Sequence, residues 1–359
     1  MKKLISIILA IMFLASIGAA YAADGDIIWS KIYDSNDNEP YGVAVDRQNN
    51  VIVTGDGGTV KYGPDGNELW AHSIYGNDVA VDSNNNIILT DGSETMKYDP
   101  NGNPLWASAI TFGGEAVVVD SNNNIIVTGS SGTRKYDSTG TPLWPSAIGI
   151  SGDDVALDSH DNIIVIGDGD SYFIEKRDPN GNMLWDKTID ITSGSDYGVG
   201  VAVDSHDNIV VTGWVNDPDP SINYASCTIK LATGGTEIWR IYDNSGSRWS
   251  YKVAIDSYDN IVLAGGKYDP SGEKYQWLTV KYDSNGRTIW ERDYDFTLGA
   301  HDDAYDVAVD SQNNIVVTGY VYNDTEENYF TIKYQGVPPR SKSLPIAQIL
   351  KILKLNKEK

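Results

Sequence analysis

The stretch VVVDSNNNIIVTG, residues 117–129, places two apolar runs on either side of a polar, turn-forming segment. This pattern predicts a tight β-hairpin, because Val and Ile runs favour strands and clustered Asp and Asn favour turns. The stretch occurs in seven versions along the chain, at 43–55, 79–91, 117–129, 155–167, 201–213, 253–265 and 307–319. Such internal repetition indicates a repeat architecture.

A second unit separates the copies and completes each repeat. An example is TVKYGPDGNELW, residues 59–70, which holds two more strand-like runs around a Gly-containing turn. Four short strands per repeat of roughly 40 residues are typical of a propeller blade. The sequence therefore predicts an all-β fold, a seven-bladed β-propeller with four antiparallel strands per blade.

The two ends of the repeat region predict how the ring closes. DIIWSKIYD (26–34) resembles a fourth strand with no first three before it, and YFTIKY (329–334) resembles a third strand with no fourth after it. The N-terminal strand is therefore expected to complete the last blade, which leaves no open edge. An open solenoid is the alternative, but it has no need of this offset.

The stretch HDDAYDVAVDSQNNIVVTGYVYND, residues 301–324, followed by YFTIKY resembles the SBBP type of β-propeller repeat and, more distantly, NHL repeats. The resemblance covers about residues 26 to 334. It implies a secreted or surface-exposed propeller. It implies little about activity, since a shared scaffold does not carry function.

The segments outside the repeats predict the cellular location. Residues 1–22 have a Lys pair, an apolar run and small residues before Ala23, which predicts a cleaved signal peptide and a secreted, periplasmic or cell-surface protein. A retained membrane anchor is the alternative. The propeller is expected over 23–335. The basic tail, 336–359, has the spacing of a short amphipathic helix that could touch a membrane or a partner, or it is a frayed end.

Charge and cysteine content narrow the possible partners. The formal net charge is −23, and eight of the 27 Lys and Arg residues lie in the leader and the tail, so the body between them is more acidic still. Such an acidic body repels nucleic acid and anionic membranes, which leaves cations, neutral sugars and basic protein surfaces. Cys227 is the single cysteine, so no internal disulfide forms.

Loop lengths distinguish the two faces of the predicted ring. Two connections have constant length in the repeats: the turn between the first and second strands, and the turn between the third strand and the Trp of the fourth. The connections from the second strand to the third, and from the fourth strand to the next repeat, vary in length and are long in blades 5, 6 and 7. All long connections fall on one face, because strands in a blade are antiparallel. Loops grow where function is added to a rigid scaffold, although simple tolerance of insertions is the alternative.

The long connections of blades 5–7 are rich in aromatic and acidic residues. Flat aromatic faces among carboxylates suit carbohydrate rings or a protein segment; the competing interpretation is that these side chains pack their own loops. The predicted ligand-binding residues are Tyr197, Trp214, Tyr224, Trp249, Tyr251, Tyr268, Tyr275, His301, Asp302, Asp303, Tyr305 and Tyr322.

A cation site is a separate hypothesis. Asp78, Asp154 and Asp306 precede the first strand of their repeats, where the chain enters the central channel, and Lys252 takes the same place in blade 6. Converging carboxylates at the channel mouth could bind Ca²⁺, whereas solvated acids around water are the plainer interpretation. The Asp and Asn of each repeated turn are expected to be structural, as are the seven third-strand Lys residues.

Three functions remain open from the sequence. The first is an exported, non-catalytic propeller that binds a carbohydrate or protein ligand on the long-loop face of blades 5–7. The second is a propeller hydrolase or lyase acting on carbohydrate or peptide, with a Ca²⁺-type cation. The third is a passive structural module of the cell surface. Support for catalysis is thin, because the sequence assembles no recognisable catalytic set and no catalytic residue is predicted.

Overall fold

Seven antiparallel sheets form the protein in the computed structural model, which describes residues 23–34, 38–167, 169, 171–219, 221–268, 274–296, 301–322 and 326–336. The predicted signal peptide (1–22) and nearly all of the basic tail lie outside the described residues. In the part of the chain that the structure describes, there is no helix with the length and apolar character needed to span a bilayer.

The first four blades are built from short strands. Blade 1 contains β2 (Pro40–Val45), β3 (Val51–Gly55), β4 (Gly58–Tyr62) and β5 (Glu68–His72). Blade 2 contains β6 (Asp78–Val81), β7 (Ile87–Thr90) and β8 (Thr95–Tyr98), and blade 3 contains β9 (Ala116–Val119), β10 (Ile125–Gly129) and β11 (Gly132–Tyr136). Blade 4 contains β12 (Asp154–Leu157), β13 (Ile163–Gly167), β14 (Tyr172–Arg177) and β15 (Met183–Ile189).

The other three blades have longer strands. Blade 5 contains β16 (Asp196–Val203), β17 (Ile209–Asn216), β18 (Tyr224–Leu231) and β19 (Glu237–Asp243). Blade 6 contains β20 (Arg248–Ile255), β21 (Ile261–Tyr268), β22 (Tyr275–Tyr282) and β23 (Thr288–Tyr294). Blade 7 contains β24 (Asp303–Val309), β25 (Ile315–Tyr322), β26 (Glu327–Tyr334) and, from the other end of the chain, β1 (Ile27–Tyr33).

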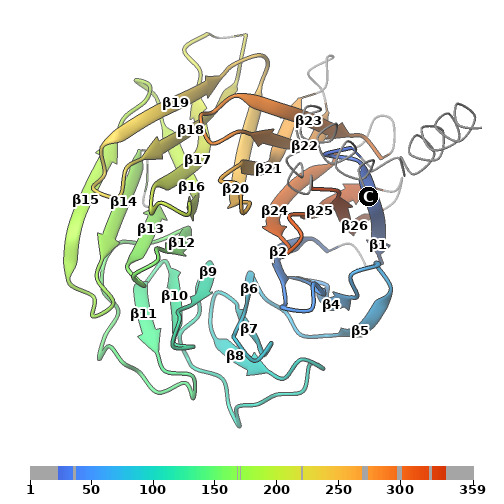
Figure 1. Cartoon of the computed structure of the whole chain (residues 1–359), viewed down its shortest axis with the longest axis vertical. Coiled ribbons are helices and arrows are strands. Elements are labelled where there is room, and N and C mark those ends of the chain that lie inside the picture. The colour runs from blue at the N-terminus through green and yellow to red at the C-terminus, as the bar shows by residue number, and fades with distance from the viewer. Residues whose placement is uncertain are drawn as a thin grey trace, which may run out of the picture.

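The blades are arranged in a closed ring, as predicted (Figure 1). The first strand of every blade faces the centre, and each of these inner strands contacts the next one around the circle, including β24 and β2. Closure is made by β1, which pairs antiparallel with β26 so that Trp29 lies opposite Lys333. Trp29 Nε1 donates to the Pro64 carbonyl at 3.0 Å, as Trp70 Nε1 does to Pro100 at 3.1 Å, so β1 acts as an ordinary outer strand.

The outer edge of blades 2 and 3 differs from the regular pattern. There the fourth segment lies along the third strand through isolated bridges, Tyr98 with Pro104 and Tyr136 with Pro142 among them, instead of a continuous ladder. Between the two bridges of blade 2, the third strand advances three positions, from Thr95 to Tyr98, while the outer segment advances six, from Pro104 to Ile110. Blade 3 has the same mismatch, so the outer segment of each blade bulges away from the third strand between its bridges.

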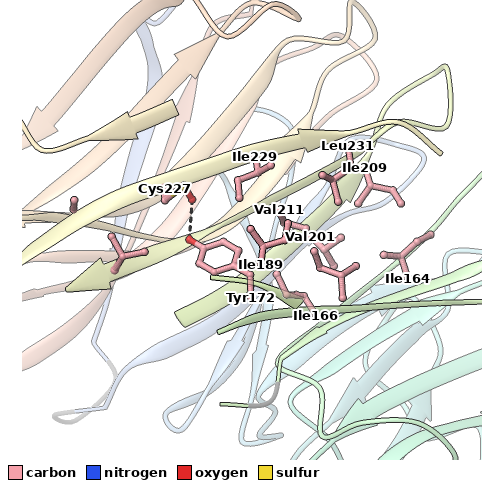
Figure 2. Close-up of a cluster of buried hydrophobic side chains, with 13 residues drawn as sticks. Ile164, Ile166, Tyr172, Ile189, Val201, Ile209, Val211, Cys227, Ile229 and Leu231 are labelled. Atoms are coloured by element: carbon pink, nitrogen blue, oxygen red, sulfur yellow. Dashed lines mark hydrogen bonds between the residues drawn. The ribbon is translucent and has the colours of Figure 1, made fainter. Parts of the chain in front are cut away.

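Apolar side chains fill the space between neighbouring sheets. The described residues form seven buried clusters, one at each interface between adjacent blades. Figure 2 shows the cluster between blades 4 and 5, where Ile164 and Ile166 face Val201 and Val211. Both faces of each sheet are covered in this way, which explains why the strands are apolar throughout instead of alternating.

The repeated Asp anchors its turn and the Lys of the third strand. In blade 1, the Asp46 carboxylate accepts the N–H groups of Gln48 and Asn50, both at 2.9 Å, and pairs with Lys61 Nζ at 2.9 Å. The same buried Asp–Lys pair occurs in all seven blades. The expected structural role of both residues is confirmed.

The same turns also connect neighbouring blades. Their fourth residue, an Asn or Asp at the position of Asn49, has φ of 58 to 64° in every blade. Its side chain accepts the N–H that follows the repeat Asp of the preceding blade; Arg47 N–H, for example, donates to Asn85 Oδ1 at 3.0 Å. These bonds run around the whole ring, and Ser311 to Asn49 closes it.

Candidate ligand-binding face

The insertions in blades 5–7 lengthen the strands themselves. The inner three strands there have seven or eight residues, against four to six in blades 1–4. At about 3.3 Å per residue, the added length extends these blades by roughly 10 Å. Most of the predicted ligand residues lie on these extensions, where a strand holds a side chain more firmly than a loop does.

A pocket of about 190 Å³ lies on this face, over blades 5 and 6. Six aromatic side chains from five strands line it: Trp214, Tyr224, Trp249, Tyr251, Tyr268 and Tyr275. All six were predicted ligand residues, and the structure brings them together at one place. The Trp249 ring is at the base and is 6% exposed.

The walls of this aromatic pocket stand nearly at right angles to one another. The Trp249 ring makes edge contacts with Tyr224, Tyr268 and Tyr275 at interplanar angles of 86°, 80° and 83°. Trp214 and Tyr251 meet at 79°. Edge-to-face packing is favourable for aromatic rings and fixes their orientation, so the pocket is preformed.

Three bulged tyrosines extend the aromatic surface toward the ring centre. The inner strands of blades 1, 6 and 7 each contain a β-bulge, and the extra residue is Tyr41, Tyr251 or Tyr305. The Tyr305 ring contacts Tyr251 at 5.3 Å and Tyr41 at 6.1 Å between centroids. Together with Trp214 and Tyr197, which stack at 5.4 Å, these residues form a continuous aromatic arc over blades 5, 6, 7 and 1.

Sequence reasoning missed Tyr41, although a signal was present. Each bulged Tyr lies five positions before its repeat Asp, so aligning the repeats at that offset identifies all three. A matching Gly on the second strand supports the bulge, because a Cβ at Gly265 would collide with the Trp249 carbonyl oxygen. Blade 5 has the same bulge with Val199 at this offset, and blades 2, 3 and 4 have Asn77, Glu115 and Asp153 there.

Asp302 and Asp303 lie beneath the surface, in contrast to the expectation that they face the ligand. Asp302 accepts the N–H groups of Phe296 and Tyr322 at 2.7 and 3.1 Å. Burial raises the pKa of the Asp302 carboxyl to about 6, although these hydrogen bonds favour its charged form. The carboxylate therefore holds two connections in place, and it is 0% exposed.

Asp303 supports the aromatic pocket from below. Its carboxylate accepts Trp249 Nε1–H at 3.0 Å and the Tyr251 hydroxyl at 3.2 Å. Burial raises the pKa of this carboxyl well above its usual range, with the two hydrogen bonds acting against the shift. Asp303 is 3% exposed, so it reaches a ligand only through the rings that it binds.

The remaining predicted residues lie around the pocket and the arc. His301 is exposed, and its ring lies 4.4 Å from that of Tyr275. Tyr197 is 36% exposed at the outer end of the arc. Tyr322 ends β25 and is partly exposed.

The centre of the ring is occupied by a lysine. Lys252 Nζ lies 2.7 Å from Asp154 Oδ1. Burial alone would lower the pKa of the Lys252 ammonium, but Asp154, Asp78 and Asp306 outweigh it and raise the pKa. This tethered cation therefore interacts with all three carboxylates for which the sequence suggested Ca²⁺.

Backbone groups take up further oxygens of these carboxylates. Asp78, Asp154 and Asp306 accept the N–H of Val117, Val201 and Val43 of the next blade at 2.8, 2.8 and 2.6 Å. Among the described residues, this trio is absent from the groups of three acidic, His or Cys side chains that converge closely enough to ligate one metal ion. These contacts of the three carboxylates do not favour the Ca²⁺ site that the sequence suggested.

The convergent groups on the opposite face are Asp158 with His160 and Asp207, and Asp204 with His206 and Asp259. The first member of each is already paired with a Lys, at 2.8 Å for Asp158 and Lys176. Asp207 accepts both the N–H and the hydroxyl of Ser159. These carboxylates maintain the turns.

Comparison with known proteins identifies the fold. No protein-family model and no curated protein sequence matches the chain. Among solved structures, BamB from Moraxella catarrhalis is similar with a TM-score of 0.54 and 13% identity, over 87% of this chain and 100% of BamB. The extracellular domain of BT4673, a putative one-component system from B. thetaiotaomicron, is similar with a TM-score of 0.56 and 11% identity, over 87% and 42%.

A fungal alcohol oxidase of the AA5 family, in complex with copper, is similar with a TM-score of 0.58 and 13% identity, over 88% of this chain and 77% of the oxidase. Similarity at such low identity indicates a shared fold alone, because a fold does not determine function. The fold and the comparisons define the chain as a β-propeller protein. The more specific SBBP or NHL repeat type stays a prediction from the sequence.

Proposed function

We propose that this chain is an exported, non-catalytic propeller that binds a carbohydrate or protein ligand on the aromatic arc and pocket of blades 5, 6, 7 and 1. The observation that carries this proposal is the contrast at one structural position. Five residues before the repeat Asp, blades 6, 7 and 1 have Tyr251, Tyr305 and Tyr41, whereas blades 2 to 5 have Asn77, Glu115, Asp153 and Val199. The scaffold therefore does not require an aromatic residue there, and a ligand surface explains why three adjacent blades have one.

Binding is favoured over catalysis by the state of the carboxylates. A catalytic acid or base must reach the proton that it transfers. Asp302 and Asp303 are buried and already accept hydrogen bonds from the protein. This face presents aromatic surface to a ligand, and Glu115 and Asp153 are exposed on the short-stranded blades 3 and 4 beside it.

A binding screen tests the proposal. Labelled protein is applied to an array of glycans and basic peptides, together with the variants Tyr41→Ala and Tyr305→Ala. The matched control is Tyr258→Ala, which removes a 41% exposed tyrosine from a fixed turn on the opposite face. Loss of one stacking contact should weaken binding at least about fivefold in the arc variants.

The wild type and the control should bind the same ligands with equal affinity. Circular dichroism confirms that each variant is folded. If the wild type binds no ligand, or if all variants bind equally well, the proposal is wrong and the protein is better described as a passive structural module.

A further inference from the structure

The aromatic pocket is more selective than the arc around it. Its volume of about 190 Å³ is below the 300–1,000 Å³ that is usual for drug-sized ligands. An extended chain can lie along the arc, but the pocket admits only one small group. The lining side chains are all aromatic, so a group inserted there is surrounded by ring faces and edges.

The polar atoms at the base of the pocket are already engaged. Trp249 Nε1–H and the Tyr251 hydroxyl both donate to Asp303. Donation to a carboxylate increases the electron density of a ring, which strengthens the attraction of its face for a cation. A sugar hydroxyl would find these two donors occupied.

Asp303 also lacks a positive partner. In the part of the chain that the structure describes, no Lys, Arg or His nitrogen lies within ion-pair distance of its carboxylate. Leaving a buried carboxylate without a countercharge is costly, and burial accordingly raises the pKa of the Asp303 carboxyl and favours its neutral form. A cation in the pocket, against the Trp249 and Tyr251 rings that donate to Asp303, would supply a countercharge and favour the ionised carboxylate.

The type of cation follows from hydrogen-bonding capacity. A primary ammonium has three N–H donors, each of which needs an acceptor when it is taken out of water. The aromatic rings that line the pocket are poor hydrogen-bond acceptors for these N–H groups. A quaternary ammonium has no N–H to satisfy and presents methyl groups to the rings, so its desolvation cost is smaller and the cation–π attraction remains.

We propose that the pocket formed by Trp214, Tyr224, Trp249, Tyr251, Tyr268 and Tyr275 binds a quaternary ammonium group, with Asp303 as the buried countercharge. This inference rests on the proposed function, because it names the ligand chemistry of the same face. Choline, a trimethyllysine side chain and a phosphatidylcholine headgroup share this chemistry.

Calorimetric titration tests the inference with a matched pair of probes. Choline and 3,3-dimethylbutan-1-ol have the same shape, but only choline is charged. Choline is expected to bind at least about tenfold more tightly than the neutral alcohol, in keeping with a desolvated cation–π contact. Equal affinities would overturn the inference, since they would show an apolar pocket with no preference for charge.

Variants connect the binding to the proposed residues. Asp303→Asn and Trp249→Phe should each weaken choline binding at least about fivefold, whereas Tyr258→Ala should leave it unchanged. Preserved choline binding in a folded Asp303→Asn protein would overturn the role of Asp303. Two further titrations identify the source of the quaternary ammonium group. One compares a trimethyllysine peptide with its unmethylated counterpart, and the other uses phosphatidylcholine vesicles. The probe that binds most tightly indicates whether the natural ligand is a modified protein, a lipid surface or free choline.

Failure of this inference differs from failure of the proposed function. Binding of an array ligand that depends on Tyr41 and Tyr305, with no binding of any quaternary ammonium probe, overturns the inference alone. Absence of both kinds of binding overturns both.

Discussion

Single residues determine how the blades are joined. The left-handed Asn or Asp of each repeated turn has two roles: it adopts a backbone conformation that few side chains tolerate, and it accepts a hydrogen bond from the neighbouring blade. Asn is suited to both, because its short polar side chain tolerates positive φ better than most. The seven-fold repetition of this residue type is therefore explained without reference to a ligand.

Replacing Asn85 should separate these two roles. Asn85→Gly keeps the backbone relaxed but loses the bond from Arg47, which should cost about 1 kcal/mol of unfolding free energy. Asn85→Ala loses the same bond and places in the left-handed region a side chain without the polar group that lets Asn tolerate it, which costs about 1–2 kcal/mol more than Asn85→Gly. Urea denaturation of the two variants measures both terms. A loss for Asn85→Ala no larger than that for Asn85→Gly would contradict the assignment of strain to this position.

At the scale of strands, sequence predicts the regular part of the structure well. Blade number, closure by β1 and the Asp–Lys pairs all follow from repeated spacing, because periodic side chains encode local pairing. The partial loss of the outer strand in blades 2 and 3 was not predicted, because the sequence analysis expected the same four strands in every blade.

The binding face was predicted only in outline. The position of the long connections placed the six residues of the aromatic pocket on one face, but it did not predict the burial of Asp302 and Asp303 beneath them. Nor did it show that Lys252 would lie among carboxylates of three other blades. These features depend on packing between elements that are distant in the chain.

An engineered disulfide tests the closure strand directly. Lys31 lies opposite Thr331 in the β1–β26 pair. Lys31→Cys with Thr331→Cys should therefore oxidise, because opposite residues in antiparallel strands approach to about 4.5–5.5 Å between Cα atoms. The loop closed is nearly the whole ring, so stability should rise by up to about 5 kcal/mol.

Free-thiol titration in denaturant gives the readout. After oxidation, only Cys227 should react in the double variant, since Cys227 is buried in the folded protein and has no partner within reach of β1. The single variant Lys31→Cys should retain two reactive thiols. Three reactive thiols in the oxidised double variant would show that β1 does not pair with β26 in this register.

At the scale of the whole molecule, the centre of the ring links stability to pH. Burial raises the pKa of Asp78 to about 6, and burial together with the Asp78 charge raises the pKa of Asp306 to about 8, with Lys252 opposing both shifts. The folded protein therefore holds protons that the unfolded chain releases near pH 4. This contribution to stability is complete below about pH 4 and is lost as pH rises through about 6 and 8.

The melting temperature should consequently fall by at least about 2 °C between about pH 6 and about pH 9. Asp306→Asn should make that slope shallower, whatever its effect on absolute stability, because the highest of these pKa values is removed. Differential scanning calorimetry across this range gives both slopes. An unchanged slope in the variant would mean that Asp306 titrates as an ordinary exposed carboxyl.

The central claim is that the aromatic pocket over blades 5 and 6, on the long-loop face of a closed ring, binds a quaternary ammonium group. A crystal structure of the protein soaked with choline tests this claim most directly. The account predicts density for the trimethylammonium group between the rings of Trp214, Trp249 and Tyr275, over blades 5 and 6. Choline bound on the fixed-turn face beside Tyr258, or a pocket that stays empty at saturating choline, would contradict it.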